Sequence, residues 1–257
     1  MRNKSLKLCG FTVIMGIFGA FLRWLQIQNT FDSETDLFIS HSPWSYAVIL
    51  FFVIFAIALF RWIRGMRSLS FPSKYPDVYS ENIPFASIAA ILIGAIMAVG
   101  GAATILRSVR SSQSAFDLIL GLSTFVSAAG LAAFIMSAGK SEKKSNGHFG
   151  AVCSVFYICF WLIAAYKFSA AEPAIWSFAP KLLSLCAVLL AFYFIAGFVF
   201  NKPRPLSALY FSLLSVFLCI ITLADLYPIG EKIITVGIIL ALTLLSFSQI
   251  SGAVSKR

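Results

Sequence analysis

Long apolar stretches alternate with short polar segments along the whole chain, and eight such stretches can be distinguished. Each has about 18–24 residues, close to the roughly 20 that cross a ~30 Å hydrocarbon layer as a helix. Lipid offers the backbone no hydrogen-bond partners, and a β-barrel would show alternating segments of about ten residues instead. The predicted spans are Leu6–Ile27, Ser42–Phe60, Pro84–Leu106, Leu118–Gly139, Phe149–Tyr166, Leu182–Phe200, Pro205–Ala224 and Ile233–Ser251. The fold class predicted is all-α: an integral membrane bundle of about eight transmembrane helices.

The composition excludes an ordinary soluble domain. Of the 257 residues, 60% are hydrophobic and only 12% are charged, whereas a soluble domain has about 25% charged residues. The mean hydropathy is +0.90. So little charge cannot cover a surface that faces water, but a surface that faces lipid needs no such cover. We therefore expect the lipid bilayer itself to be the main partner of this chain.

The basic residues predict the orientation of the bundle. Fourteen of the 20 fall at the chain ends or in alternate gaps between spans: Arg2, Lys4, Lys7, Arg61, Arg64, Arg67, Lys74, Lys140, Lys143, Lys144, Lys202, Arg204, Lys256 and Arg257. Because cytoplasmic loops are enriched in Lys and Arg, both termini are expected inside, in the cytoplasmic (plasma) membrane. A net charge of +10 can also indicate nucleic-acid binding. Here topology already accounts for the charge, so no nucleic-acid partner is expected.

The chain is expected to form a single polytopic membrane domain, 1-257. Loop lengths suggest two parallel halves of four spans, 1-140 and 149-257, because in each half a longer loop is followed by a tighter turn on the same side. The longest connection on the basic side, Arg61–Ile83, is expected to lie along the membrane interface. All nine prolines are expected in loops or at helix ends. Small residues in Pro84–Gly139 favour close helix packing, inside the bundle or in a homodimer.

Ionisable residues inside a membrane are costly and are therefore candidates for function. Eight fall at or near the ends of spans on the less basic side: Arg23, Arg107, Asp117, Lys167, Glu172, Lys181, Asp225 and Glu231. From these we assign Arg23, Asp225, Lys167, Glu172, Arg107 and Asp117 to a ligand site in an outward-facing polar vestibule. The alternative is structural: Arg23 extends to lipid headgroups or pairs with a carboxylate such as Asp225.

Three aromatic residues, Tyr157, Trp161 and Tyr193, lie deeper in adjacent spans, where they either line a cavity or pack. No catalytic or metal motif is found. The two histidines, His41 and His148, fall in predicted loops on opposite sides of the membrane. They can form neither a shared metal site nor a triad. We therefore expect a protein that is not an enzyme and uses no metal or cofactor.

Part of the sequence carries a family resemblance. Within Phe156–Pro205, a span ends in Tyr166 and Lys167, an acid–proline pair follows, and the next span contains Tyr-x-x-Ala-Gly-Phe before a basic turn with Pro203. This pattern, together with Phe21–Asp36, resembles a clostridial-type group of uncharacterised bacterial multipass membrane proteins, in which Asp stands at the position of Glu172. The resemblance covers about half the chain and implies a multipass membrane fold without an assigned activity.

Two functions are consistent with these observations. The first is to bind or transport a small molecule or lipid through the polar vestibule. The second is to act as a non-catalytic scaffold or sensory subunit through a partner membrane protein. The two functions differ in whether Arg23 and its acidic partners face a cavity or are sealed in the bundle.

Overall fold

A computed structural model describes residues 2–30, 42–72, 75, 78, 86–111, 115–137, 147–169 and 175–255. Within these residues the chain forms eight long helices, each apolar and long enough to cross a membrane. They are α1 (Arg2–Thr30), α2 (Pro43–Gly65), α4 (Ala86–Ser111), α5 (Ala115–Ser137), α6 (Gly147–Ser169), α7 (Ile175–Val199), α8 (Pro205–Thr222) and α9 (Ile229–Ser251). The prediction of an all-α bundle with eight spans is confirmed.

The helices extend past several of the predicted span ends. For example, α1 begins at Arg2 rather than Leu6, and α2 continues to Gly65 rather than ending at Phe60. Regular backbone hydrogen bonding continues into the charged segments, whereas the predicted spans ended where apolar residues gave way to charge. Pro43 and Pro205 occupy the first turn of α2 and α8, as expected for a residue without an N–H. The expectation for Pro180 was wrong, because α7 begins before it and encloses it.

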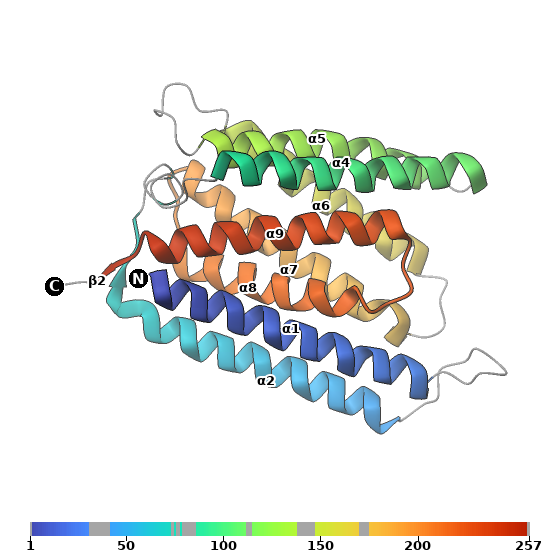
Figure 1. Cartoon of the computed structure of the whole chain (residues 1–257), viewed down its shortest axis with the longest axis horizontal. Helices are drawn as coiled ribbons and strands as arrows, with labels where there is room; N and C mark the ends of the chain where they lie inside the picture. Colours follow the sequence, from blue (N-terminus) through green and yellow to red (C-terminus); the bar gives the residue numbers. More distant parts are fainter. Residues whose placement is uncertain are drawn as a thin grey trace.

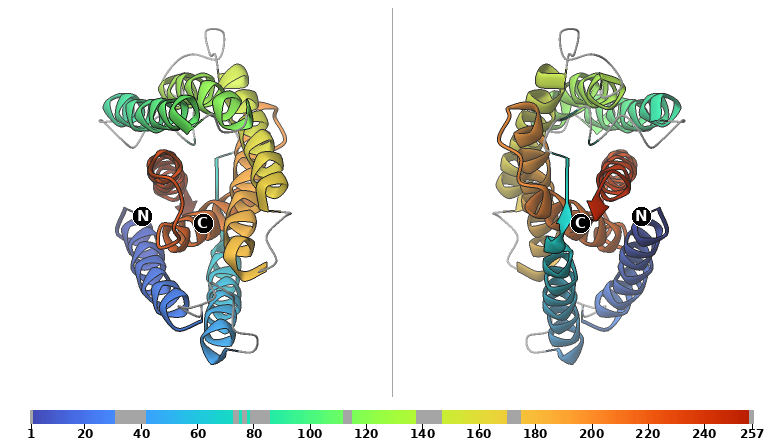
Figure 2. Two further views of the ribbon diagram at one scale, coloured as in Figure 1. Left: turned by 90° about the vertical axis from the view of Figure 1, so that its right-hand side faces the viewer. Right: turned by 90° about the vertical axis from the view of Figure 1, so that its left-hand side faces the viewer.

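Six of the helices form a closed ring. Each of α4, α5, α6, α7 and α8 contacts the next helix in sequence, and α9 contacts both α8 and α4. The α1–α2 hairpin lies outside this ring against α8, and α1 also contacts α9 (Figures 1 and 2). More than half of the most apolar part of α7, α8 and α9 is buried, against a third or less in α1, α2 and α4. The apolar core therefore lies inside the ring and along α8.

The described part of the first half is not packed like the second. The α1–α2 and α4–α5 hairpins contact helices of the second half, whereas α6 to α9 contact one another in sequence order. The two halves, 1-140 and 149-257, stay a prediction, and superposing one on the other is its test.

Both chain ends lie at the same end of the bundle, which we call the basic end because Lys7, Arg61, Arg64, Lys202 and Arg204 lie there (Figure 1). The other end is called the opposite end. At the basic end, a short 3-10 turn, η1 (Met66–Ser68), follows α2. The two-residue strands β1 (Leu69–Ser70) and β2 (Val254–Ser255) then pair antiparallel, with Leu69 opposite Ser255.

The connection after β1 packs against the bundle at two described positions, and its predicted place along the membrane interface stays a prediction. Tyr75 and Val78 are 6% and 1% exposed and belong to the apolar core. The Tyr75 hydroxyl donates to the carbonyl of Phe134 and lies 3.1 Å from the Ser137 hydroxyl. The Ser248 hydroxyl donates to the Val78 carbonyl at 3.1 Å. These contacts connect Tyr75 to α5 and Val78 to α9 at the basic end of the ring.

Candidate functional site

The charged residues selected from the sequence lie on several elements at the opposite end of the bundle. Arg23 is on α1, Arg107 on α4, Asp117 on α5 and Lys167 on α6, while Asp225 lies in the turn between α8 and α9. Glu172 lies outside the described residues. The described members do not form one site. They divide into a buried pair, Arg23 with Asp225, and a second group around Asp117.

Arg23 and Asp225 form a buried ion pair. The Arg23 Nε atom donates to Asp225 Oδ1 at 2.7 Å, and the two side chains are only 2% and 4% exposed. Arg23 Nη1 donates to Gln26 Oε1 at 2.7 Å, and Gln26 Nε2 donates to the Ser45 hydroxyl at 3.0 Å. The network therefore links α1 and α2 to the turn after α8. Neither charged side chain lines a described cavity.

The electrostatics of Asp225 reflect this burial. Burial raises the pKa of its carboxyl above the ordinary value, and the Arg23 guanidinium opposes that shift. Its second oxygen, Oδ2, is buried without a hydrogen-bond partner among the described residues. The charged form of a buried carboxylate with one unsatisfied oxygen depends strongly on nearby opposite charges for its stability. Arg23 is the partner bonded to Asp225, and Lys181 and Lys232 also act on this carboxylate electrostatically.

A second ion pair lies inside the ring, between Lys181 near the start of α7 and Glu231 in the first turn of α9. Both side chains are 14% exposed, so this pair is more accessible than the first. The Lys181 ammonium also lies 4.2 Å from the centroid of the Tyr227 ring. Asp117 lies within electrostatic range of Arg107, Lys181 and Glu231.

Lys167, the remaining described member of the predicted site, lies 4.0 Å from the centroid of the Phe116 ring. Phe116 directly precedes Asp117. Lys167 is therefore held by a cation–π contact next to this second group.

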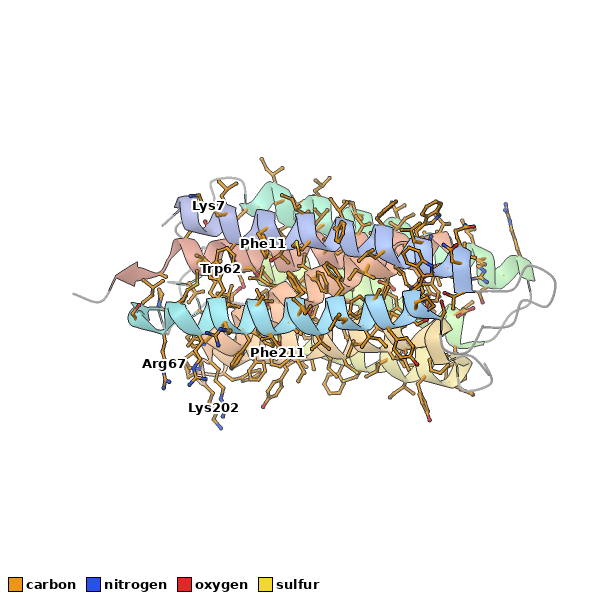
Figure 3. All side chains as sticks on the ribbon, turned by 90° about the horizontal axis from the view of Figure 1, so that it is seen from below. Lys7, Phe11, Trp62, Arg67, Lys202 and Phe211 are labelled. Carbon is orange, nitrogen blue, oxygen red and sulfur yellow. The ribbon has the colours of Figure 1, made fainter. Side chains whose placement is uncertain are left out.

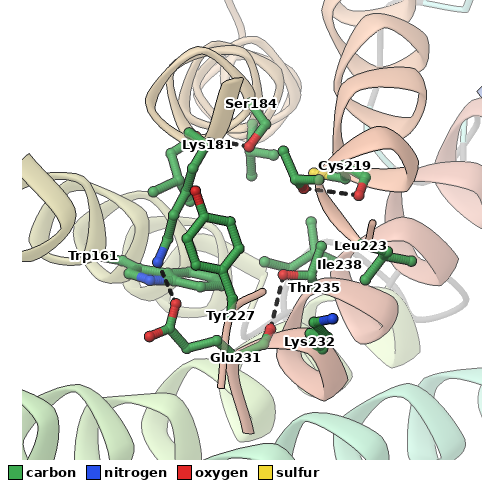
Figure 4. A pocket seen from close by; sticks show the side chains of 13 residues that line it. Trp161, Lys181, Ser184, Cys219, Leu223, Tyr227, Glu231, Lys232, Thr235 and Ile238 are labelled. Atoms are coloured by element: carbon green, nitrogen blue, oxygen red, sulfur yellow. Dashed lines mark hydrogen bonds and ion pairs between the residues drawn. The ribbon is translucent and has the colours of Figure 1, made fainter. Parts of the chain in front are cut away.

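A small cavity adjoins the Lys181–Glu231 pair (Figure 4). Residues of four ring helices line it, with Trp161 from α6, Ser184 from α7, Thr222 from α8 and Thr235 from α9. Its volume is about 20 Å³. A cavity of roughly 10–15 Å³ or more holds one water molecule, so this space accommodates a single water molecule.

The sequence identified Lys181 and Glu231 as charged residues near span ends but did not select them for the site. Sequence position gives the depth of a residue in the membrane but does not show which helix faces which. Of the three aromatic residues considered, Tyr157 and Trp161 are buried in the ring, and the Tyr157 hydroxyl lies 2.9 Å from that of Thr124. Tyr193 is 60% exposed and lies outside the core.

Among the described residues, no three His, Cys, Asp or Glu side chains come close enough together to hold a metal ion. Comparisons of the chain with protein-family models, curated proteins and solved structures give no match. The family resemblance of Phe156–Pro205 therefore stays a prediction, and functional assignment rests on the geometry of this multipass membrane protein.

Proposed function

We propose that the protein is a non-enzymatic membrane protein that binds, and moves along the axis of its six-helix ring, a small charged or zwitterionic molecule. The observation that carries this proposal is the Lys181–Glu231 pair next to a cavity inside the ring. The excess of basic residues at the other end supports an outer position for this pair in the membrane. In this proposal the polar vestibule consists of Lys181 and Glu231, with Asp117 and Arg107 beside them, rather than of Arg23 and Asp225.

The chemistry of the pair suits a zwitterionic ligand. A carboxylate of the ligand would bind the Lys181 ammonium, and an ammonium of the ligand would bind the Glu231 carboxylate. The ligand would thus replace the contact that the two side chains make with each other, and neither charge would be left unpaired. Ser184, Thr222 and Thr235 supply hydroxyl groups along the cavity, and Tyr227 supplies a ring for a cation.

The proposed movement requires both ends of the ring to open. Ligand sites have volumes of about 300–1,000 Å³, far above the 20 Å³ cavity. Separation of Lys181 from Glu231 would enlarge the cavity at the opposite end. Opening of the basic end would require the release of Tyr75 and Val78, which are bound there to α5 and α9. The closed state described here corresponds to an occluded conformation in this proposal.

A second candidate function is supported by the sealed Arg23–Asp225 network. A buried ion pair that joins three elements and lines no described cavity serves to order the outer face of the bundle. An ordered outer face is what a scaffold or sensory subunit would present to a partner membrane protein. The two proposals differ in whether the isolated protein binds a small molecule.

We expect a small charged metabolite to raise the thermal stability of the purified protein and to lose this effect in Glu231→Gln. A ligand that binds only the folded state stabilises it by about 2.7 kcal/mol at 100 times its Kd. The measurement is thermal unfolding against a library of amino acids and other small ions. Glu231→Gln preserves shape but removes the charge that would hold a ligand cation.

Arg110→Gln is the matched control, because Arg110 is exposed at the same end and does not line the cavity. It should retain the shift found with the native protein. A shift that survives in Glu231→Gln and Lys181→Met would contradict the site. Absence of any shift, with a membrane protein copurifying in fixed ratio, would favour the scaffold function.

A further inference from the structure

A groove of about 320 Å³ lies between α6 and α7, on the half of the bundle nearest the basic end. It is separate from the Lys181–Glu231 cavity and shares no lining residue with it. Apolar side chains line most of its length, among them Val152, Phe156 and Tyr193. Phe156 and Tyr193 are 71% and 60% exposed, so the groove opens to the outside of the bundle. At this depth the outside is the hydrocarbon of the membrane.

The basic end of the groove is formed by the turn between α7 and α8. Lys202 and Arg204 line the groove there, and both are exposed. Figure 3 shows the Lys202 side chain projecting away from the bundle on the same side as Arg67. Among the described residues, no acidic side chain lines the groove. This part of the groove therefore combines an apolar body with two positive charges at one end.

The turn is held in a defined conformation. Asn201 has a φ of 55°, and the Lys202 N–H donates to the Gly197 carbonyl at 2.8 Å. The N–H of Lys202 thus bonds to the carbonyl five residues before it, and the residue just before Lys202 has a left-handed backbone conformation. This is the arrangement of a Schellman motif at a helix C-terminus. Asn is one of the few residues that readily adopts the left-handed conformation this motif requires. Pro205 then begins α8 directly. Lys202 and Arg204 consequently project from a fixed backbone three and five residues after the last residue of α7, Val199.

We infer that this groove binds an anionic phospholipid, with one acyl chain along Val152, Phe156 and Tyr193 and the phosphate between Lys202 and Arg204. The span that contains Tyr193 ends at Val199, so the two cations lie at the depth of the headgroups. Basic pockets between transmembrane helices on the cytoplasmic side bind anionic headgroups. An apolar groove that continues from such a pocket additionally selects a ligand with an acyl chain, which a free phosphate lacks.

The test uses the full chain in detergent, with added phosphatidylglycerol or phosphatidylcholine of the same acyl chains. Thermal unfolding and native mass spectrometry report binding. We expect phosphatidylglycerol to bind on the order of 10-fold more tightly than phosphatidylcholine, because its headgroup carries a net negative charge, whereas the choline ammonium neutralises the phosphate of phosphatidylcholine. The Lys202→Gln/Arg204→Gln protein should lose this preference. Both residues are exposed, so the variant should fold normally.

The matched control is Lys7→Gln/Arg61→Gln. It removes two exposed cations from the same end of the bundle, and neither lines the groove. This control should retain the preference for phosphatidylglycerol. If both double variants lose it equally, the effect is a general attraction to the basic end, and the inference is wrong.

Val152→Trp tests the acyl-chain part separately by filling the groove with a larger side chain. We expect it to weaken binding of phosphatidylglycerol while leaving Lys202 and Arg204 in place. Inorganic phosphate should give no stabilisation. Equal stabilisation by inorganic phosphate, or unchanged lipid binding in Val152→Trp, would overturn the assignment to a phospholipid. None of these variants alters the cavity residues of the proposed function, so the two proposals fail independently.

Discussion

Arg23→Met should destabilise the protein by about 3–5 kcal/mol near neutral pH, the usual cost of removing one partner from a buried ion pair. The Asp225 side chain, which is 4% exposed in the native protein, would then lack the guanidinium that now opposes the effect of burial on its pKa. The measurement is the free energy or midpoint of unfolding in detergent. Arg110→Met is the control, and as an exposed residue at the same end it should change stability by about 0.5 kcal/mol or less.

The pH dependence of this loss identifies its cause. Burial already raises the pKa of Asp225, and removal of Arg23 should raise it further. A carboxyl group whose pKa is higher in the folded than in the unfolded state stabilises the fold below its unfolded pKa. That contribution is lost as pH rises through the folded pKa. The difference in the free energy of unfolding between the native protein and Arg23→Met should therefore become smaller near pH 4 and larger toward about pH 8.

Replacing the carboxylate in the same background should rescue the variant. The amide that Asp225→Asn introduces carries no charge, so the Arg23→Met/Asp225→Asn protein should be more stable than Arg23→Met alone at neutral pH. A double-mutant cycle then gives the interaction free energy between the two positions. If Arg23→Met matched the native protein at every pH, or if Asp225→Asn gave no rescue, the pair would not order the opposite end of the bundle.

Gly150→Ala should be the other strongly destabilising substitution, by about 1–3 kcal/mol or more, because it overpacks a helix contact. A Cβ atom on Gly150 of α6 would overlap the carbonyl oxygen of Gly130 on α5 and lie 2.9 Å from the Cβ of Phe134. Backbone atoms cannot move aside as the end of a flexible side chain can. The α5–α6 contact of the ring would therefore have to separate.

Gly10→Ala provides the matched control, since no heavy atom lies within 4 Å of the position its Cβ would occupy. In a helix interior, Ala is favoured over Gly by about 0.5–1 kcal/mol. Thermal unfolding should therefore show Gly10→Ala unchanged or stabilised and Gly150→Ala destabilised. Equal shifts in the two variants would mean that the close approach of α5 and α6 does not constrain the fold.

The helices that are long and apolar enough to cross a membrane could be predicted from the sequence alone. The apolar stretches could be recognised because each crossing helix must satisfy its own backbone hydrogen bonds and present apolar side chains to lipid. Both requirements are local, so each span could be recognised without knowing its neighbours. The pairing of Arg23 with Asp225 was also among the structural alternatives, because two opposite charges at the same depth in lipid attract each other strongly.

Which helices are neighbours became known from the folded structure and not from the sequence. Lipid tails are as apolar as leucine, so the hydrophobic pattern that defines a span does not specify the partner against which it packs. The closed ring of α4 to α9, the entry of Tyr75 and Val78 into its basic end, and the pairing of Lys181 with Glu231 all depend on contacts distant in sequence. For the same reason the groove between α6 and α7 could not be read from the chain, although Lys202 and Arg204 could.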